Sequence, residues 1–130
     1  MGKTYWAHSA PEGGGSWESF GEHTRCVVEK AEHFSKPLRF QDLARLAAML
    51  HDAGKLSELF TRRIEGKEAG LDHWSPGAAL AVHPDIGNSL AAGVAIQGHH
   101  IGLQRWPSCT KNEIKSAFGI GTRNLEKAVP

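Results

Sequence analysis

The sequence predicts an all-α domain of about six helices, and three observations support this fold class. Apolar residues recur at spacings of three and four in most segments, which is the repeat of one helix face. Residues typical of helix ends, above all serine, proline and glycine, separate these segments. No segment shows sustained alternation of apolar and polar residues rich in β-branched side chains, so no strand is expected.

The chain divides into an irregular N-terminal arm, residues 1–15, and a helical part, residues 16–130, within one domain overall. The run Gly13-Gly14-Gly15 gives the arm too much backbone freedom to start a helix. A chain of 130 residues can bury about two thirds of its unfolded surface around a single core. It therefore needs no metal or disulfide merely to fold.

Two helices are expected in the first half of the chain. Ser16 is a candidate cap for a helix that runs to about residue 34. The inward stripe of this helix consists of Phe20, His23, Val27, Ala31 and Phe34. Pro37 then breaks the chain, and a second helix begins near residue 40 with Gly54 as a natural terminator just beyond it. Its buried face consists of Leu43, Leu46, Ala47 and Leu50.

Four shorter helices complete the prediction. Ser57 can cap a helix that ends near residue 65 and is closed by Gly66. Ser75-Pro76 is typical of a helix start, a hydroxyl cap followed by proline, for an alanine-rich helix that ends near residue 83. A fifth helix, about residues 87–97, is followed by Gly98-His99-His100. A capping box at residues 110–113 opens the last helix, which is kinked near residues 119–121.

Composition excludes several functional classes. A formal net charge of +1 gives no global basic field of the kind found in many nucleic-acid-binding proteins, so any site for a polyanion must be local. Cys26 and Cys109 form no CxxC pair and indicate no disulfide framework, which favours a reducing compartment. There is no apolar run approaching 18 residues and no basic-then-apolar leader. We therefore expect a cytoplasmic protein with no membrane association.

The eight histidines are the unusual feature of the composition, because imidazole is a common metal ligand and a common acid/base group. The stretch Leu50-His51-Asp52-Ala53-Gly54-Lys55 places an imidazole beside a carboxylate at the end of the second helix. Metal ligands in helical bundles usually come from several helices that face one another. Four separate segments supply such candidates here: His23, His51, Asp52, His73, His99 and His100.

A mixed nitrogen and oxygen ligand set suits a divalent transition metal, namely Mn, Fe, Co, Ni or Zn, with Mg as a further candidate. One or two ions are expected, since a carboxylate such as Asp52 can bridge two. This chemistry fits phosphate-ester hydrolysis, in which the ions lower the pKa of a bound water and stabilise the attacking and leaving oxygens. Asp52 and Lys55 are the candidate catalytic residues, and Lys55 would bind substrate by neutralising a phosphate oxygen.

Taken singly, these features also have plainer interpretations. An inward histidine such as His23 is more often a hydrogen-bonded structural residue than a ligand, and a lone His-Asp pair is common by chance. His33 and His83 are expected at the surface or at helix ends. Arg62-Arg63 and the basic residues of the last helix are more often a solvated face than a track for a phosphodiester backbone. The conjunction of motifs is what favours a metal site.

An ordered series of short motifs runs through about residues 5–105. It consists of Trp6-Ala7-His8-Ser9, Trp17 through His23, Met49-Leu50-His51-Asp52-Ala53-Gly54-Lys55 with Phe60 after it, His73-Trp74-Ser75-Pro76-Gly77-Ala78, and Gly98-His99-His100-Ile101-Gly102-Leu103. This series resembles the HD superfamily, and more closely the HD nuclease domain of the CRISPR-associated Cas3 proteins. The resemblance implies an HD-domain helical bundle.

The resemblance also implies an activity and its residues. It implies a metal-dependent nuclease that hydrolyses phosphodiester bonds of single-stranded DNA in CRISPR interference, beside a Cas3 helicase and a guide-RNA surveillance complex. It places His23, His51 and Asp52 around one metal. Asp52 would bridge to a second metal held by His73, His99 and His100, with Lys55 near the scissile phosphate.

Two departures from the family pattern leave alternatives open. The sequence contains no helicase motif, so the helicase would be a separate or removed chain. The family closes its first metal site with an aspartate downstream of the His-His pair, whereas the only acidic residues after His100 are Glu113 and Glu126. We therefore expect a truncated or minimal form. The alternatives are an HD phosphohydrolase acting on nucleotides or small phosphoesters, and a weakly active or inactive module that binds metal or serves as an interaction subunit.

Overall fold

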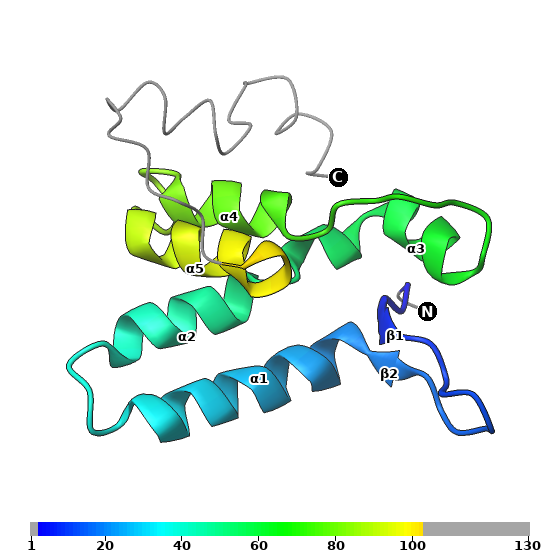
Figure 1. Ribbon diagram of the computed structural model, residues 1–130, viewed down its shortest axis with the longest axis horizontal. Helices are drawn as coiled ribbons and strands as arrows, with labels where there is room; N and C mark the ends of the chain where they lie inside the picture. Colours follow the sequence, from blue (N-terminus) through cyan, green and yellow to red (C-terminus); the bar gives the residue numbers. More distant parts are fainter. Residues whose placement is uncertain (1–2, 103–130) are drawn as a thin grey trace.

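The protein is mainly helical, as the sequence predicts. The computed structural model describes residues 3–102, and this part contains five α-helices, one 3-10 helix (η1) and a two-stranded antiparallel hairpin (Figure 1). The predicted last helix lies outside the described residues. Within the described part, no helix is both long and apolar enough to cross a bilayer. The elements are β1 (Trp6–His8), β2 (Glu18–Ser19), α1 (Phe20–Ser35), α2 (Gln41–Leu50), η1 (Ala53–Leu56), α3 (Glu58–Ile64), α4 (Ser75–Val82) and α5 (Leu90–Ile101).

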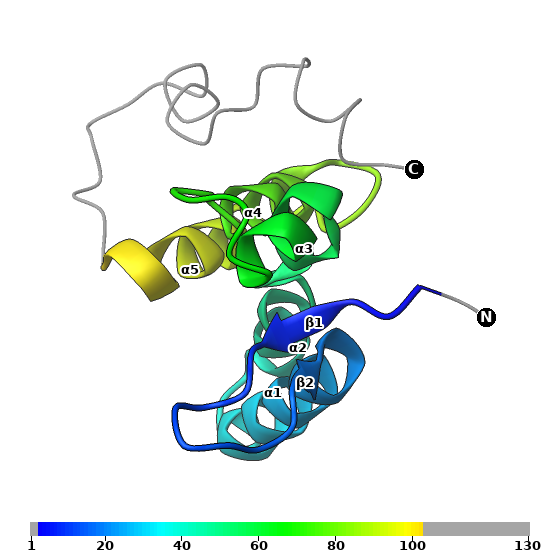
Figure 2. The same ribbon diagram turned by 90° about the vertical axis from the view of Figure 1, so that its right-hand side faces the viewer.

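The helix α2 is the centre of the arrangement. It packs against α1 on one side and against the α4–α5 pair on the other (Figure 1). The strand β1 lies beside the start of α1 and also contacts η1 and α3 (Figure 2). The C-terminal end of α2 therefore lies close to α1, to the loop before α4 and to the end of α5, which carry the other candidate ligands.

Three alanines and one isoleucine form the core between α4 and α5. Ala78, Ala81, Ala92 and Ile96 are almost completely buried. The predicted buried face of the second helix is confirmed, since Leu43, Leu46, Ala47 and Leu50 pack against this core together with Trp74. Gly77 makes the approach of α4 to α2 especially close, because a β-carbon there would overlap the carbonyl oxygen of Leu50. The α4 backbone is thus fixed against the residues that precede His51 and Asp52.

The first helix begins at Phe20, and the prediction that Ser16 caps it is wrong. Ser19 is the cap: its hydroxyl oxygen accepts a hydrogen bond from the Glu22 amide at 3.2 Å, and Glu22 reaches back to the Ser19 amide. This reciprocal capping box satisfies two amide groups that a helix start otherwise leaves unpaired. Phe34 is 72% exposed, so it does not belong to the buried stripe.

The start of the first helix is delayed because the residues before it form β2. This strand pairs with β1, which lies in the arm that the sequence predicts to be irregular. The indole rings of Trp6 and Trp17 pack edge to face across the hairpin, 5.8 Å apart. The strands are three and two residues long, too short for alternation to reveal them.

Two further helices of the prediction need correction. The fourth helix is capped not by the Ser75 hydroxyl but by the carboxylate of Asp72, which accepts from the amides of Trp74 and Ser75, both at 2.9 Å. The fifth helix begins after Ser89 and includes His99 and His100 in its last turn instead of ending before them. The third helix, in contrast, is confirmed: Ser57 caps it through the Phe60 amide, and Gly66 follows it with a φ of 76°.

Candidate metal centre

Asp52 is the centre of the candidate site and is 3% exposed. It follows His51, the C-terminal cap of α2, and precedes the single turn of η1. Gly54, expected as a helix terminator, has a different role, because its amide donates to the carbonyl oxygen of His73 at 3.2 Å. A β-carbon on Gly54 would lie 2.5 Å from that oxygen. Glycine at this position therefore allows the backbone that carries Asp52 to pack directly on the backbone that carries His73.

One carboxylate oxygen of Asp52 faces the first two helices. The distances from Asp52 Oδ2 are 3.3 Å to Nε2 of His23 and 3.1 Å to Nε2 of His51. The same oxygen lies 2.8 Å from Nζ of Lys55. The two imidazole nitrogens are 3.3 Å from each other. Thus α1 and α2 each direct one histidine to the same side of the carboxylate.

The other oxygen faces a second group of histidines. Asp52 Oδ1 lies 3.5 Å from Nε2 of His73 and 3.9 Å from Nε2 of His99. His100 completes this group, since its Nε2 is 2.9 Å from that of His73. Asp52 Oδ1 is buried, yet it accepts no hydrogen bond from any residue in the described part of the chain. A buried carboxylate oxygen without a donor is costly unless a cation occupies the space beside it.

Hydrogen bonds at the far side of three rings fix which nitrogen faces Asp52. The Nδ1 of His51 donates to the carbonyl oxygen of Ala48 at 2.8 Å, and that of His99 donates to the carbonyl oxygen of Ile96. The Nδ1 of His23 donates to a carboxylate oxygen of Glu18 at 3.2 Å. A neutral imidazole with its proton on Nδ1 has a lone pair on Nε2. Three lone pairs therefore converge on one carboxylate, which is the arrangement that a divalent cation requires.

This geometry satisfies the requirements of a metal site. Two sets of side chains have ligand atoms within 4.8 Å of one another around Asp52, one with His23 and His51 and one with His99 and His100. The imidazole and carboxylate ligands suit a transition metal. The buried cluster around Asp52 could therefore hold a metal ion.

The pKa values of the cluster favour its metal-binding forms. Burial alone would raise the pKa of Asp52, but hydrogen bonds and charges from His51 and Lys55 hold it well below its usual range. Burial lowers the pKa of His73 to about 4, against the usual 6.5 of histidine, and also lowers the pKa of His23 and of His100. At neutral pH the carboxylate is ionised and these three imidazoles are neutral, so an ion would have few protons to displace.

His51 differs from the other histidines of the cluster. Burial acts to lower its pKa, but hydrogen bonds to Asp52 and to the Ala48 carbonyl raise the pKa above the usual value. In the metal-free protein His51 is therefore the ring that binds a proton most readily beside the carboxylate. An incoming cation would displace this proton.

Lys55 is 5% exposed and places a positive charge against the carboxylate of Asp52. Its ammonium lies 5.6 Å from the centre of the Phe60 ring, within the range of a cation–π interaction. It also borders a hollow of about 380 Å³ beside the cluster, whose lining includes Phe60, Arg63, His73 and His100. Arg63, expected on a solvated face, is half-buried in this lining and donates to the Leu71 carbonyl oxygen at 2.7 Å.

Two residues near the cluster were not predicted as site residues. His8 Nδ1 lies 2.7 Å from Glu18 Oε2, and the Nδ1 of His23 contacts the same oxygen. The hydrogen bond from His8 is the main reason that the pKa of Glu18 is lowered. The signals that could have found them are the tryptophans at positions 6 and 17, because aromatic residues often pair across a hairpin. His33 and His83 stay at the surface and at a helix end, as expected.

The six sequence-predicted ligands come together although they derive from α1, the end of α2, the loop before α4 and the end of α5. The result is a small, mostly helical domain with a His/Asp cluster that could bind metal. In comparisons with models of protein families, with curated proteins and with solved structures, the chain matches none.

Proposed function

We propose that the protein is a metal-dependent phosphodiesterase of the HD type, a nuclease that acts on single-stranded DNA. One observation carries the proposal: the two oxygens of Asp52 face two separate histidine groups, and Lys55 lies beside one of the oxygens. A divalent ion held there would act as a Lewis acid that polarises a phosphate oxygen and makes water more acidic. The motif order gives the specific version of this proposal, a nuclease similar to the Cas3 HD domain.

Each of the chain's own residues has a definite role in this proposal. The buried carboxylate of Asp52 binds the cation, and the histidines direct their Nε2 atoms to the same position. Lys55 neutralises a phosphate oxygen of a substrate that enters the adjoining hollow. The Phe60 ring and the Arg63 guanidinium, whose Cζ lies 6.0 Å from the ring centre, line that hollow and offer surfaces on which a base can stack. The helicase and the guide-RNA surveillance complex are proposed partners.

A second candidate function follows from the size of the hollow. Its volume, about 380 Å³, is in the lower part of the range for small-molecule sites, and the net charge of +1 offers no broad basic track for a long polyanion. A phosphohydrolase acting on nucleotides or small phosphoesters would use the same residues. Within the described residues, the group formed by His23, His51 and Asp52 contains one carboxylate, which supports a weakly active form of either enzyme.

The test is hydrolysis of several substrates by the wild type and the Asp52→Ala variant, each with Mn, Ni, Co or Mg. Asp85→Ala is the matched control, since Asp85 is an exposed aspartate outside the cluster. We expect the wild type and the control to cleave single-stranded oligonucleotides, and Asp52→Ala to lose the activity. Faster turnover of mononucleotides than of oligonucleotides would select the second candidate. Absence of cleavage in all three proteins would contradict both.

A further inference from the structure

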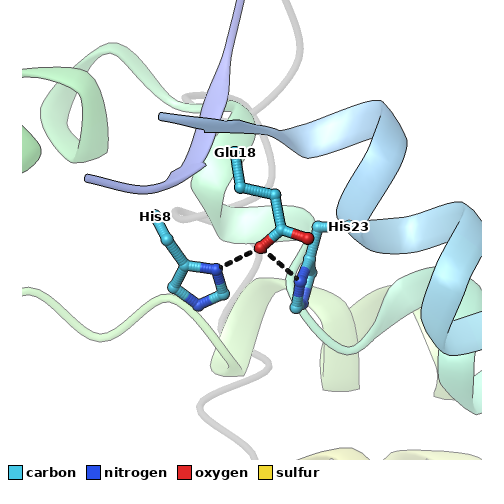
Figure 3. A group of neighbouring side chains, drawn as sticks. All are labelled: His8, Glu18 and His23. Atoms are coloured by element: carbon cyan, nitrogen blue, oxygen red, sulfur yellow. Dashed lines mark hydrogen bonds and ion pairs between the residues drawn. The ribbon is translucent and has the colours of Figure 1, made fainter. Parts of the chain in front are cut away.

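A single carboxylate joins two histidines beside the metal centre. The Oε2 atom of Glu18 lies 2.7 Å from Nδ1 of His8 and 3.2 Å from Nδ1 of His23, and Figure 3 shows this oxygen facing both rings. Glu18 comes from β2 and His8 from β1, whereas His23 lies in the first turns of α1. A carboxylate of the hairpin thus contacts His23, whose ring also faces Asp52.

Backbone pairing sets this geometry. In the register of the hairpin, His8 is the partner of Glu18, and Trp6 is the partner of Ser19. The Phe20 amide, at the first residue of α1, donates to the carbonyl oxygen of Tyr5 at 2.9 Å. The hairpin and the helix start are therefore one hydrogen-bonded unit. It holds the Glu18 carboxylate at a fixed place relative to His23.

The two nitrogens of His23 have different tasks. Its Nε2 lies 3.3 Å from both Nε2 of His51 and Oδ2 of Asp52, two atoms of the candidate centre. Its Nδ1 faces only an acceptor, the Glu18 oxygen, so the proton of a neutral ring belongs on Nδ1. With the proton there, the lone pair on Nε2 points to the metal position. Carboxylates that accept from the far nitrogen of a metal-binding histidine fix its tautomer and orientation in this way.

The same carboxylate also reaches Lys55 through His8. The Nε2 of His8 is 3.5 Å from Nζ of Lys55, which in turn lies 2.8 Å from Asp52 Oδ2. Since an ammonium group only donates, His8 accepts through Nε2 and donates to Glu18 through Nδ1. Asp52, His23, Glu18, His8 and Lys55 therefore form a closed ring of polar contacts. Glu18 is joined to Asp52 through His23 on one side and through His8 and Lys55 on the other, so it lies outside the candidate metal centre.

We propose that Glu18, supported by His8, is a positioning residue for the metal centre. It holds His23 in the tautomer with the proton on Nδ1 and so sets the affinity of the centre for a divalent ion. This inference rests on the proposed metal centre, but it concerns the residues of the hairpin, which that proposal does not use. It gives the pair of short strands a role in the metal centre.

A separate cation between His8, Glu18 and His23 is the competing interpretation, because these three side chains also have ligand atoms within 4.8 Å of one another. It would need the lone pair of His23 on Nδ1. The neutral ring would then carry its proton on Nε2, facing the centre at Asp52. The convergence of Nε2 lone pairs on Asp52 favours the positioning role, and stoichiometry distinguishes the two.

The first measurement is made on the metal-free protein. Long-range ¹⁵N–¹H NMR at pH 8, where imidazoles are neutral, reports the tautomer of each histidine. We expect His23 to carry its proton on Nδ1 in the wild type. Glu18→Ala should shift the ring toward the Nε2-protonated form, and Glu18→Gln should restore it in part, because the amide oxygen still accepts. Glu12→Ala, an exposed glutamate in the loop between the strands, is the matched control.

The second measurement is calorimetric titration of the same four proteins with Mn and Zn. Loss of the supporting carboxylate should weaken binding by about 10- to 100-fold at unchanged stoichiometry. Glu18→Gln should fall between Glu18→Ala and the wild type, and Glu12→Ala should match the wild type. The α1 capping box of Ser19 and Glu22 stays intact in every variant, and the amide NMR spectrum confirms the fold.

Three results would overturn the proposal. An unchanged His23 tautomer and unchanged affinity in Glu18→Ala would show that Glu18 does not act on the centre. Loss of one bound ion with unchanged affinity for the rest would make Glu18 a ligand of a separate site. A wild type that binds no ion would remove the centre itself. Failure of the proposed function alone looks different, since it leaves the tautomer and affinity effects in place without any cleavage.

Discussion

The ammonium of Lys55 lies 2.8 Å from a carboxylate oxygen of Asp52, and both side chains are almost completely buried. A buried charge is costly unless it is paired, so each residue depends on the other in the metal-free protein. The pair also joins the metal-binding cluster to the hollow beside it, because Asp52 faces the histidines and Lys55 lines the hollow. Stability and metal binding are therefore coupled at this contact.

Replacement of this lysine should reveal the coupling. Lys55→Met leaves the Asp52 charge without its partner, so we expect a loss of about 3 kcal/mol in the free energy of unfolding of the metal-free protein. Added Mn should restore much of the lost stability, because the ion then balances the carboxylate. Thermal unfolding in chelator and in Mn measures both effects. Lys67→Met, at an exposed surface pair, is the control, and equal melting temperatures for the two variants in chelator would contradict the prediction.

The two histidine groups should be separable by metal analysis. We expect two ions per wild-type chain, since each oxygen of Asp52 faces its own group. His51→Ala and His99→Ala should each retain one ion, whereas Asp52→Ala should retain none. Native mass spectrometry with Mn or Zn counts the ions directly. His33→Ala, at an exposed histidine, should behave as the wild type. A wild type with a single ion that both variants lose would show one shared site instead.

Acid should destabilise the metal-free protein at pH values where most surface carboxylates are still ionised. Burial lowers the pKa of His73 to about 4 in the folded chain, against about 6.5 in the unfolded chain. The unfolded chain therefore binds the proton first, so this contribution to stability is complete above about pH 6.5 and is lost as the pH falls toward 4. His23 and His100 shift in the same direction, and His51 in the opposite direction.

The expected loss from His73 alone is about 3 kcal/mol between pH 6.5 and 4, because one pKa unit corresponds to about 1.4 kcal/mol. Urea unfolding in chelator at pH 7, 5.5 and 4.5 measures the change. His73→Gln removes the titrating ring and should flatten the profile. Stability that stays constant or rises as the pH falls to 4.5 would be inconsistent with the lowered pKa.

The contact between Gly54 and His73 gives a steric test. In Gly54→Ala the new β-carbon meets the His73 carbonyl oxygen at 2.5 Å and its α-carbon at 2.8 Å, both of which are backbone atoms that cannot rotate away. We expect a loss of about 1 to 3 kcal/mol in stability and weaker metal binding, since His73 must move relative to Asp52. Gly21→Ala is the control, because nothing lies within 4 Å of a β-carbon there.

Chemical denaturation and metal titration of the two glycine variants give the comparison. The control should be neutral or slightly more stable, as alanine is the better helix former. If both variants lose the same stability, the close packing at Gly54 is not the cause. If Gly54→Ala binds metal as tightly as the wild type, His73 does not contribute to the candidate centre.

Much of this architecture follows from periodicity and capping residues in the sequence. The stripe of leucines on α2, the Ser57 cap and the all-α class are local signals, and the structure confirms them. Residue type and motif order also indicated the six candidate ligands, which the structure brings together. Their convergence on Asp52 depends on the packing of α2 against α4, where Gly77 permits close approach, and no local pattern contains this information.

The hairpin was missed for a different physical reason. Its strands are two and three residues long, and Glu18 and His8 meet through backbone pairing, not through helical spacing. Likewise Ser16 and Ser75 have the chemistry of caps but are displaced from that role by better-placed neighbours, Ser19 and Asp72. The geometry of the turn before each helix decides which polar side chain accepts from the free amides, and the sequence does not contain that geometry.

The ligands around Asp52 come from elements spread over most of the described chain, and each is brought there only by folding. An ion bound by this set would be a reversible cross-link that exists in the native state and not in the unfolded one. At a free concentration 100 times its dissociation constant, such an ion adds about 2.7 kcal/mol to stability. The fraction of the chain that is folded would then follow the supply of free metal around it.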